Sequence, residues 1–96
     1  MKWYVYILFC DQKIYYIGIT DNLKRRLDEH IKGYSGYTKK FSDIEMVYKE
    51  AYDNRKVAEI REKQLKGWSV AKKKALISGD TKLLIDLSKS TGVGEV

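Results

Sequence analysis

The chain has 96 residues, a formal net charge of +6, and a composition that is 44% hydrophobic and 12% aromatic. This length suits one domain with a small core, and the aromatic content argues against disorder. The single cysteine excludes an internal disulfide and fits a reducing cytoplasm, and no apolar stretch has the length of a membrane-spanning helix, so we expect no membrane association.

The basic residues lie in separate clusters. Nineteen lysines and arginines stand against thirteen acidic residues, and the clusters fall at 24–26, 39–40, 63–66 and 72–74. Separate basic clusters suit a polyanion such as nucleic acid. A solvated, lysine-rich surface explains the same composition, and charge alone does not choose between the two.

Residues 4–18 predict a β-hairpin. Two tyrosine-rich apolar runs, at about 2–9 and 14–19, are joined by the polar residues 11–13. Both runs are apolar on both faces, so we expect the sheet to be covered on both sides. The turn lacks the glycine or asparagine that usually takes a left-handed conformation, so the register is inferred from the loop length.

The expected register brings two phenols together. A three-residue loop pairs Leu8 with Tyr16 and Tyr6 with Gly18. Tyr6 and Tyr16 then lie on one face as diagonal neighbours, and Gly18 leaves space opposite Tyr6. The pattern alone favours half-buried strand tyrosines whose hydroxyls reach the rim of the core.

A helix is expected after the hairpin, from the capping residues 20–22 to about Lys32. A stripe of leucine and isoleucine at i, i+4, i+8 faces the core. Arg26 and His30 share the i, i+4 spacing on the flank of that stripe. We therefore expect both side chains to emerge together at the margin of the core. Taken singly, each is more often a surface residue.

The loop 33–43 (GYSGYTKKFSD) interleaves aromatic rings with lysines. Such a loop can stack on bases and hold phosphates, and Tyr37, Lys39 and Lys40 are its candidate nucleic-acid contacts. The alternative is a surface loop whose rings anchor it to the sheet, and we prefer this interpretation for Phe41.

A third strand is expected at 44–52, and a helix from Asp53 or Asn54 to about Trp68. The expected apolar face of this helix consists of Val57, Ala58, Leu65 and Trp68. Arg61 falls inside that face and Glu62 at its edge, where charged groups are rarely buried without a partner. Either the two form a structural ion pair or the carboxylate serves a cavity.

Two shorter helices are expected next, one capped by Ser69 and one at 81–89 after a Gly79-Asp80 break. The order β-β-α-β-α, followed by C-terminal helices, predicts an α+β fold around a three-stranded, mainly antiparallel sheet. We expect a single domain over 1–96. Its parts are a core at about 3–77, a helical extension at 78–90 and a frayed tail at 91–96.

Several chemistries are excluded by counting. One cysteine and one histidine cannot build the usual zinc sites, and no glycine-rich phosphate loop is present. The remaining groups are two tyrosines, an arginine, a histidine and a carboxylate, and they suit phosphodiester hydrolysis. A carboxylate can hold a divalent metal, arginine can neutralise charge on the phosphate, and a phenol can relay a proton from water.

Tyr4-Val5-Tyr6 and Tyr16-Ile17-Gly18, followed by the run 22–26 (NLKRR), resemble the motifs of the GIY-YIG nuclease superfamily. The run 61–68 (REKQLKGW) resembles its small stand-alone, UPF0213-like endonuclease members. The resemblance extends from Trp3 to about Ile77. It implies a metal-dependent DNA endonuclease of the cytoplasm that uses a single Mg²⁺ (or Mn²⁺) ion and acts in DNA repair or recombination.

The resemblance also implies catalytic roles for Tyr6, Tyr16, Arg26, His30 and Glu62. Tyr6 and Tyr16 match the two motif tyrosines, and either is a candidate for handling the attacking water. Arg26 matches the arginine that contacts the phosphate, and His30 falls where relatives carry histidine or tyrosine. Glu62 matches the carboxylate that binds the metal.

Three further positions lie in or next to these motifs. Gly18 matches the glycine of the second motif, and Arg25 is a candidate DNA contact that could be confused with Arg26. Ile19 departs from relatives that carry a lysine directly after the second-motif glycine. If that lysine helps to activate a tyrosine, this chain must use another group.

A second hypothesis belongs to another class. A domain of this size has little surface with which to select a DNA sequence, so the chain could be a catalytically weak nucleic-acid-binding module that needs a protein partner for specificity. The form of DNA, whether duplex, single-stranded or branched, is not indicated by the sequence.

Overall fold

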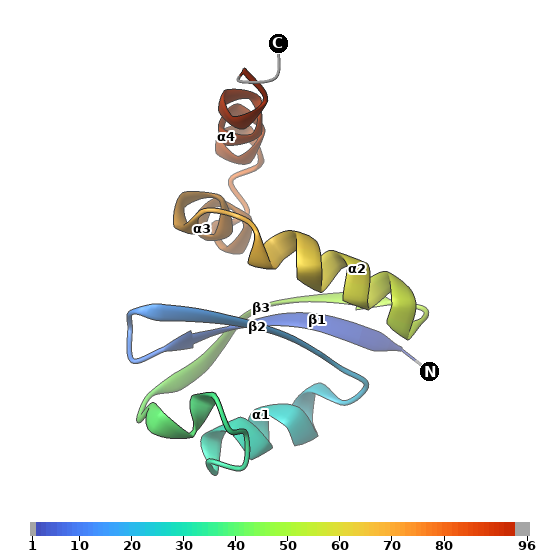
Figure 1. Cartoon of the computed structure of the whole chain (residues 1–96), viewed down its shortest axis with the longest axis vertical. Helices are drawn as coiled ribbons and strands as arrows, with labels where there is room; N and C mark the ends of the chain where they lie inside the picture. The colour runs from blue at the N-terminus through green and yellow to red at the C-terminus, as the bar shows by residue number, and fades with distance from the viewer. Residues whose placement is uncertain (1, 94–96) are drawn as a thin grey trace. The chain divides into compact units, whose positions relative to one another are not determined.

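The computed structural model describes residues 2–93, with side chains up to residue 88. A first compact unit ends at Lys66, and a second begins at Gly67. The first unit contains β1 (Trp3–Cys10), β2 (Ile14–Thr20), α1 (Leu23–Ile31), a 3₁₀ turn η1 (Thr38–Lys40), β3 (Ile44–Tyr52) and α2 (Arg55–Lys66). The second contains α3 (Val70–Ser78) and α4 (Thr81–Val93) (Figure 1).

The sheet has the strand order β2-β1-β3, and both pairings are antiparallel. The predicted α+β fold with a three-stranded antiparallel sheet is therefore confirmed. The hairpin register is also as expected, because Leu8 pairs with Tyr16 and Tyr6 pairs with Gly18. The pairing of β1 with β3 shifts by one residue between Ile7 and Leu8, which indicates a bulge in β3.

The hairpin turn is held by the loop that precedes β3. Asp11 and Gln12 both adopt left-handed backbone conformations, with φ of 52° and 57°. Non-glycine residues rarely do so without support from their surroundings. The Asp11 carboxylate accepts hydrogen bonds from the backbone N–H groups of Ser42 (3.0 Å) and Asp43 (2.8 Å). These contacts explain how a turn without glycine or asparagine keeps the expected register.

The two faces of the sheet are covered by different helices. Figure 1 shows α1 on one side of the sheet and α2 on the other. On the α1 side, the buried residues Tyr6, Leu8 and Cys10 pack with Leu23, Leu27, Phe41, Ile44 and Met46. Val5 and Ile7 alternate to the opposite side, where α2 contributes the buried residues Ala58 and Leu65. Both faces are covered, as the apolar strands predicted.

Gly18 is required by the position of Tyr6. A Cβ atom at Gly18 would lie 2.5 Å from Tyr6 Oη and 2.6 Å from Cζ, whereas a Cβ at Gly36 meets nothing within 4 Å. We expect Gly18→Ala to lower the free energy of unfolding by about 1–3 kcal/mol, the usual cost of overpacking. Urea unfolding would measure this loss beside the control Gly36→Ala. Equal stability of the two variants would contradict the predicted packing.

The end of α2 corrects one prediction. The helix stops at Lys66, before the expected end near Trp68, and Trp68 falls in the second unit. Val57 is also exposed, which leaves a narrower apolar face than expected. The reason lies in local signals, because Gly67 interrupts the helix and Ser69 caps α3 by accepting a hydrogen bond from Lys72 N–H (3.2 Å).

The second unit is a pair of helices joined at a left-handed glycine, Gly79 (φ 75°), at the predicted break. α4 runs beyond the predicted 81–89 to Val93, and thus includes the start of the tail predicted to be frayed; residues 94–96 lie outside the described residues. The division of 1–96 into a core, an extension and a tail stays a prediction. Between residues 2 and 93, no helix is both long and apolar enough to cross a membrane.

Candidate active site

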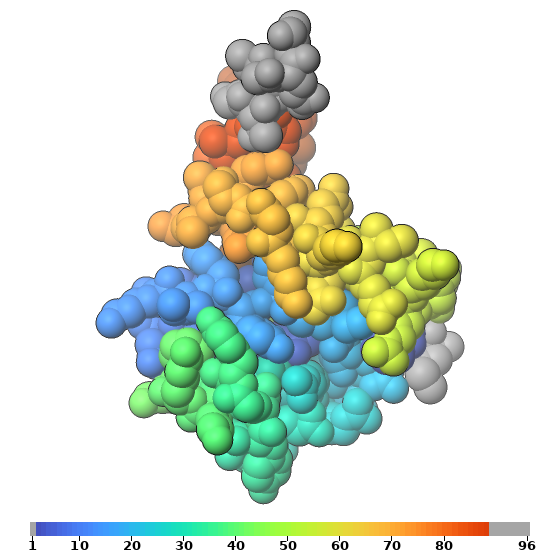
Figure 2. Space-filling view, in the orientation of Figure 1, coloured from blue at the N-terminus to red at the C-terminus, as the bar shows by residue number. Residues whose placement is uncertain are grey.

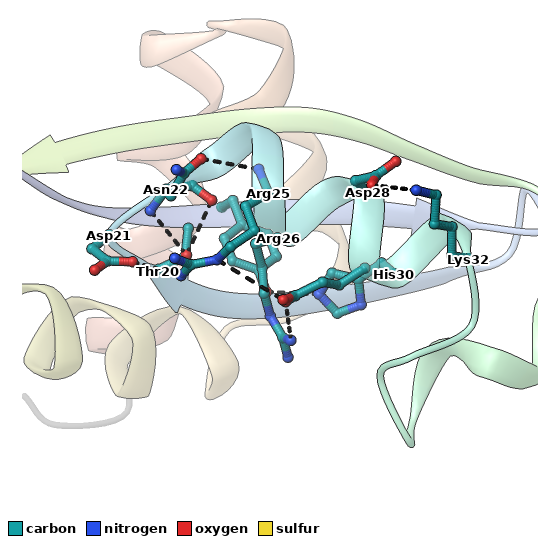
Figure 3. Close-up of polar contacts among 10 residues, drawn as sticks. Thr20, Asp21, Asn22, Arg25, Arg26, Asp28, His30 and Lys32 are labelled. Atoms are coloured by element: carbon teal, nitrogen blue, oxygen red, sulfur yellow. Dashed lines mark hydrogen bonds and ion pairs between the residues drawn. The ribbon is translucent and has the colours of Figure 1, made fainter.

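The start of α1 is fixed at the end of β2. The side chain of Asn22 accepts a hydrogen bond from Arg25 N–H (3.0 Å), and Thr20 Oγ1 accepts one from Asn22 N–H (3.1 Å) (Figure 3). These caps set the rotation of the helix relative to the sheet. Arg26 and His30 therefore project from one side of α1 toward Tyr6 on β1.

A hydrogen-bonded chain joins Arg26, Tyr6 and His30. Arg26 Nε donates to Tyr6 Oη (3.3 Å), and Tyr6 Oη lies 2.8 Å from His30 Nε2. Arg26 Nη1 also donates to Glu29 Oε1 (3.0 Å) on the next turn of the helix. The guanidinium is thus held at two points and remains partly exposed.

His30 lies inside the core and not at its margin, which corrects the expected position. Its side chain is fully buried, with 0% exposure. Its second ring nitrogen, Nδ1, lies 2.6 Å from Oγ1 of Thr38, which is also buried. The physical reason is that the segment after α1 folds over the histidine. Nothing in the sequence pattern singled out Thr38, a polar residue in a loop rich in aromatic residues.

The second motif tyrosine lies beside this chain. The ring centroid of Tyr16 is 6.4 Å from that of Tyr6 and 5.2 Å from that of His30. Tyr16 is only half-buried, and its ring stacks on exposed Tyr37 at 5.3 Å. Tyr6, Tyr16 and His30, three of the predicted site residues, therefore pack together. Arg26 forms a hydrogen bond with Tyr6.

The loop 33–43 lies at the surface, next to α1, and is drawn in green in Figure 2. Lys40 Nζ lies 4.8 Å from the ring centroid of Tyr37 and 5.3 Å from that of Phe41. Phe41 packs against the buried core, which agrees with its expected anchoring role. Lys39 and Arg25 are exposed, and Arg25 forms an ion pair with Asp21 (2.8 Å).

Glu62 and Arg61 are neighbours on α2, and the contacts described pair them with different residues. The Arg61 guanidinium instead binds Glu50 on β3 with two hydrogen bonds of 2.9 and 3.0 Å. The Glu62 carboxylate forms an ion pair with Lys66 at 3.2 Å. Its charge is one of the smaller influences that raise the pKa of Tyr6, and among the contacts described no hydrogen bond or ion pair joins it to Arg26, Tyr6 or His30. Among the contacts described, Arg61 therefore pairs with Glu50, and Glu62 pairs with Lys66.

Burial keeps Tyr6 and His30, which form the hydrogen-bonded chain with Arg26, neutral. It raises the pKa of Tyr6 to about 12, and the charges of Tyr16 and Glu62 add to this effect while Arg26 opposes it. Burial also lowers the pKa of His30 to about 4, with a smaller contribution from the charge of Arg26. Burial disfavours the Arg26 cation too, but its hydrogen bonds to Glu29 and Tyr6 outweigh this and raise its pKa. At neutral pH, Arg26 is therefore the charged side chain among these three hydrogen-bonded residues.

The neutral, buried histidine makes stability depend on pH. The folded chain takes up the His30 proton at a pKa of about 4, whereas the unfolded chain takes it up at 6.5, so protonation favours unfolding. The stabilisation is full above pH 6.5 and is lost as the pH falls toward 4, by roughly 3 kcal/mol in total.

Chemical unfolding between pH 7 and 5 would measure this effect. His30 is the only histidine of the chain, so His30→Gln should flatten the slope in this range. The same slope in the variant would contradict the assignment.

Among the described residues, no group of three or more His, Cys, Asp or Glu side chains could hold a metal ion. Glu62 is a single carboxylate. Mg²⁺ commonly keeps several waters and binds proteins through one or two carboxylates together with substrate phosphates. The residues present therefore fit an ion that shares its ligands with a phosphate, and they do not fit a site made by protein groups alone.

A model of the GIY-YIG catalytic domain matches residues 2–75. The chain belongs to the GIY-YIG family. It is similar to a UPF0213 protein of Natronomonas pharaonis, with 38% identity over 79 residues that cover 81% of this chain and 93% of the relative. A UPF0213 protein of Syntrophus aciditrophicus is 42% identical over 78 residues, which cover 79% of this chain and 90% of the relative.

A solved structure of a UPF0213 protein has a similar fold. The solution NMR structure of a UPF0213 protein from Bacillus halodurans matches with a TM-score of 0.53 and 33% identity, and covers 81% of this chain and 84% of that one. The match supports the prediction that this chain is a small stand-alone member of the family. GIY-YIG domains are nuclease domains that act on DNA and generally depend on a divalent metal, whereas the UPF0213 names state no activity.

Proposed function

We propose that the chain is an endonuclease that hydrolyses phosphodiester bonds in DNA with a single Mg²⁺ (or Mn²⁺) ion. The observation that carries this proposal is the hydrogen-bonded chain from Arg26 through Tyr6 to His30. Tyr16 packs against it, and the charge of Glu62 reaches it. A cation, a half-buried phenol and a carboxylate can each assist the cleavage of a phosphodiester.

Arg26 binds the scissile phosphate. A guanidinium has five N–H donors, of which Tyr6 and Glu29 each take one. The remaining donors can bind phosphate oxygens and stabilise the negative charge that develops in the transition state. Because Tyr6 and Glu29 already orient the side chain, little reorganisation is needed when DNA binds.

Tyr16, and not Tyr6, handles the attacking water. Tyr6 is 1% exposed, its hydroxyl contacts His30 and Arg26, and its pKa is raised to about 12. Its hydroxyl keeps its proton at neutral pH and is closed to water, so its role is to position Arg26. Tyr16 is half-buried, and its hydroxyl can orient the water and, once its own proton has left, take up the proton of the water.

Glu62 holds the divalent ion. When bound, such an ion supplies Lewis-acid polarisation of a phosphate oxygen. The ion pair with Lys66 lies at the surface, and pairs of this kind contribute little free energy, about 0–1 kcal/mol. Lys66 can therefore release the carboxylate.

The surface around Tyr37 contacts the DNA strand. Tyr37 offers a ring for stacking, and Arg25, Lys39 and Lys40 offer cations for neighbouring phosphates. We also propose that the protein is cytoplasmic, because a reducing compartment suits the lone buried thiol of Cys10. We propose further that it acts in DNA repair or recombination.

One observation favours the binding-module alternative. Glu62 pairs with Lys66, and the described residues provide no metal site of several protein ligands. A protein that binds DNA without cutting it, or that needs a partner to complete its site, would have the same pairing of Glu62 and the same lack of further metal ligands.

A panel of DNA substrates separates the two functions. The purified chain is incubated with single-stranded, duplex and branched DNA in Mg²⁺ and, in parallel, in EDTA. The nuclease predicts cleavage of at least one form in Mg²⁺ and none in EDTA. Salt-dependent binding without cleavage of any form would support the module instead.

A further inference from the structure

We propose that Thr38 is a positioning residue that accepts the Nδ1 proton of His30 and so holds the ring whose Nε2 accepts from Tyr6, which in turn holds Arg26. The inference rests on the proposed function for its consequence in cleavage, while its structural part concerns the free protein. Thr38 comes from η1, outside the motif positions that the sequence singled out.

Both nitrogens of the His30 ring are engaged in a dry environment. Nδ1 lies 2.6 Å from Thr38 Oγ1, and Nε2 lies 2.8 Å from Tyr6 Oη. His30 and Thr38 are each 0% exposed. A neutral imidazole has one donor nitrogen and one acceptor nitrogen, so the proton on the ring determines the direction of both bonds.

Arg26 decides between the two directions. A guanidinium only donates, so Tyr6 Oη accepts from Arg26 Nε in either case. If Nε2 carried the proton, Tyr6 would accept twice, and its acidic phenolic proton would have no acceptor among the contacts described. If Nδ1 carries it, the phenol donates to Nε2 and keeps a lone pair for Arg26.

In the Nδ1–H tautomer, the hydroxyl proton that lacks an acceptor belongs to Thr38 and not to Tyr6. Nδ1–H then donates to Thr38 Oγ1, and the threonine hydroxyl turns its own proton about the Cβ–Oγ bond. An aliphatic hydroxyl is a much weaker acid than a phenol, so this arrangement costs less than an unmatched phenol. The order of donation is therefore His30 to Thr38, Tyr6 to His30, and Arg26 to Tyr6.

A threonine suits this role better than a carboxylate would. A negatively charged acceptor at Nδ1 would favour the protonated imidazolium, in which Nε2 is a donor and cannot accept from Tyr6. The neutral hydroxyl keeps His30 neutral and Nε2 free to accept. The guanidinium that faces the phosphate is thus oriented by a buried residue that never touches the substrate.

The tautomer is measurable because His30 is the only histidine of the chain. Long-range ¹H–¹⁵N correlation spectra of the ¹⁵N-labelled protein, without DNA or metal, distinguish protonated from unprotonated ring nitrogens. We expect the proton on Nδ1 in the wild type and in Thr38→Ser. Thr38→Val has nearly the same shape but no acceptor. Because the bonds of Tyr6 to Arg26 and to Nε2 are unchanged, we expect the proton to stay on Nδ1 without an acceptor and its signal to exchange faster with solvent.

The consequence for Arg26 is read in the same samples. In Thr38→Val we expect faster solvent exchange of the Arg26 Nε–H and, in single-turnover assays with Mg²⁺, a cleavage rate lower by roughly 10- to 100-fold, as for a misplaced catalytic group. Thr38→Ser should restore both. Backbone amide spectra verify that each variant is folded. If Thr38→Val does not fold, the spectra of the wild type and Thr38→Ser decide the tautomer.

A wild-type proton on Nε2, or a Thr38→Val protein in which the His30 Nδ1–H and the Arg26 Nε–H exchange as slowly as in the wild type, would overturn the inference even if the wild type cleaves DNA. The reverse result, exchange that depends on Thr38 in a protein that cleaves no DNA, would reject the proposed nuclease and leave the role of Thr38 in place.

Discussion

Glu62→Ala should abolish Mg²⁺-dependent cleavage of DNA and leave the fold intact. The loss should be roughly a thousandfold or more, because a catalytic metal supplies several kcal/mol of transition-state stabilisation and each 1.4 kcal/mol is a factor of ten. The side chain is 21% exposed and its partner Lys66 is 56% exposed, so the variant loses one i,i+4 helix pair, worth about 0.3–0.5 kcal/mol. Single-turnover nicking assays and thermal unfolding measure the two effects.

Glu59→Ala is the matched control. Glu59 lies one turn earlier on α2, is 48% exposed and pairs with Arg55 at 3.1 Å. It carries the same charge on the same helix but has no contact with the chain of Arg26, Tyr6 and His30 among the described interactions. Its variant should cleave at the wild-type rate. If Glu62→Ala nicked DNA in Mg²⁺ as well as Glu59→Ala, the carboxylate would have no role in catalysis.

Arg26→Lys should lower the single-turnover rate by about 10²–10³-fold, the usual loss when one donor to a transition-state charge is removed. The substitution keeps the charge. A lysine has no planar fork, so it cannot bind Tyr6, Glu29 and a phosphate oxygen from one fixed position. The rate at saturating DNA separates this effect from weaker binding.

Arg25→Lys is the control for this substitution. Arg25 is the preceding residue, is exposed, and pairs with Asp21 and Glu29 at the surface. We expect its variant to retain the rate at saturating DNA and to change affinity at most slightly. An equal loss in both variants, or a greater loss in Arg25→Lys, would mean that the wrong arginine was assigned to the phosphate.

The hairpin shows what local pattern can predict. The length of the turn was enough to pair Tyr6 with Gly18, and a Cβ at Gly18 would indeed collide with the phenol. The turn conformation itself depends on Asp11, which is held by Ser42 and Asp43 from a distant part of the chain. Hydrogen bonds between distant segments leave no periodic signal, so left-handed residues could not be expected there from the pattern of residues.

The candidate site shows where pattern is insufficient. The i, i+4 spacing placed Arg26 and His30 on one flank of α1, and both contact Tyr6. The spacing could not show that the loop carrying Thr38 closes over His30 and buries it. Likewise, the apolar face of α2 was predicted past Lys66, because hydrophobic periodicity continues through Gly67 while the helix does not. Tertiary packing and local helix signals decided these positions.

The central claim is that these groups form a metal-dependent site for phosphodiester cleavage. Its most direct test is a Mg²⁺ titration of single-turnover cleavage by the wild-type chain, on whichever DNA form it cuts best, with Glu62→Ala and Glu59→Ala in parallel. We predict no cleavage in EDTA, a rate that rises to saturation with Mg²⁺ for the wild type and Glu59→Ala, and no measurable rate for Glu62→Ala. Cleavage in EDTA at the wild-type rate, or an identical Mg²⁺ curve for Glu62→Ala, would contradict the claim.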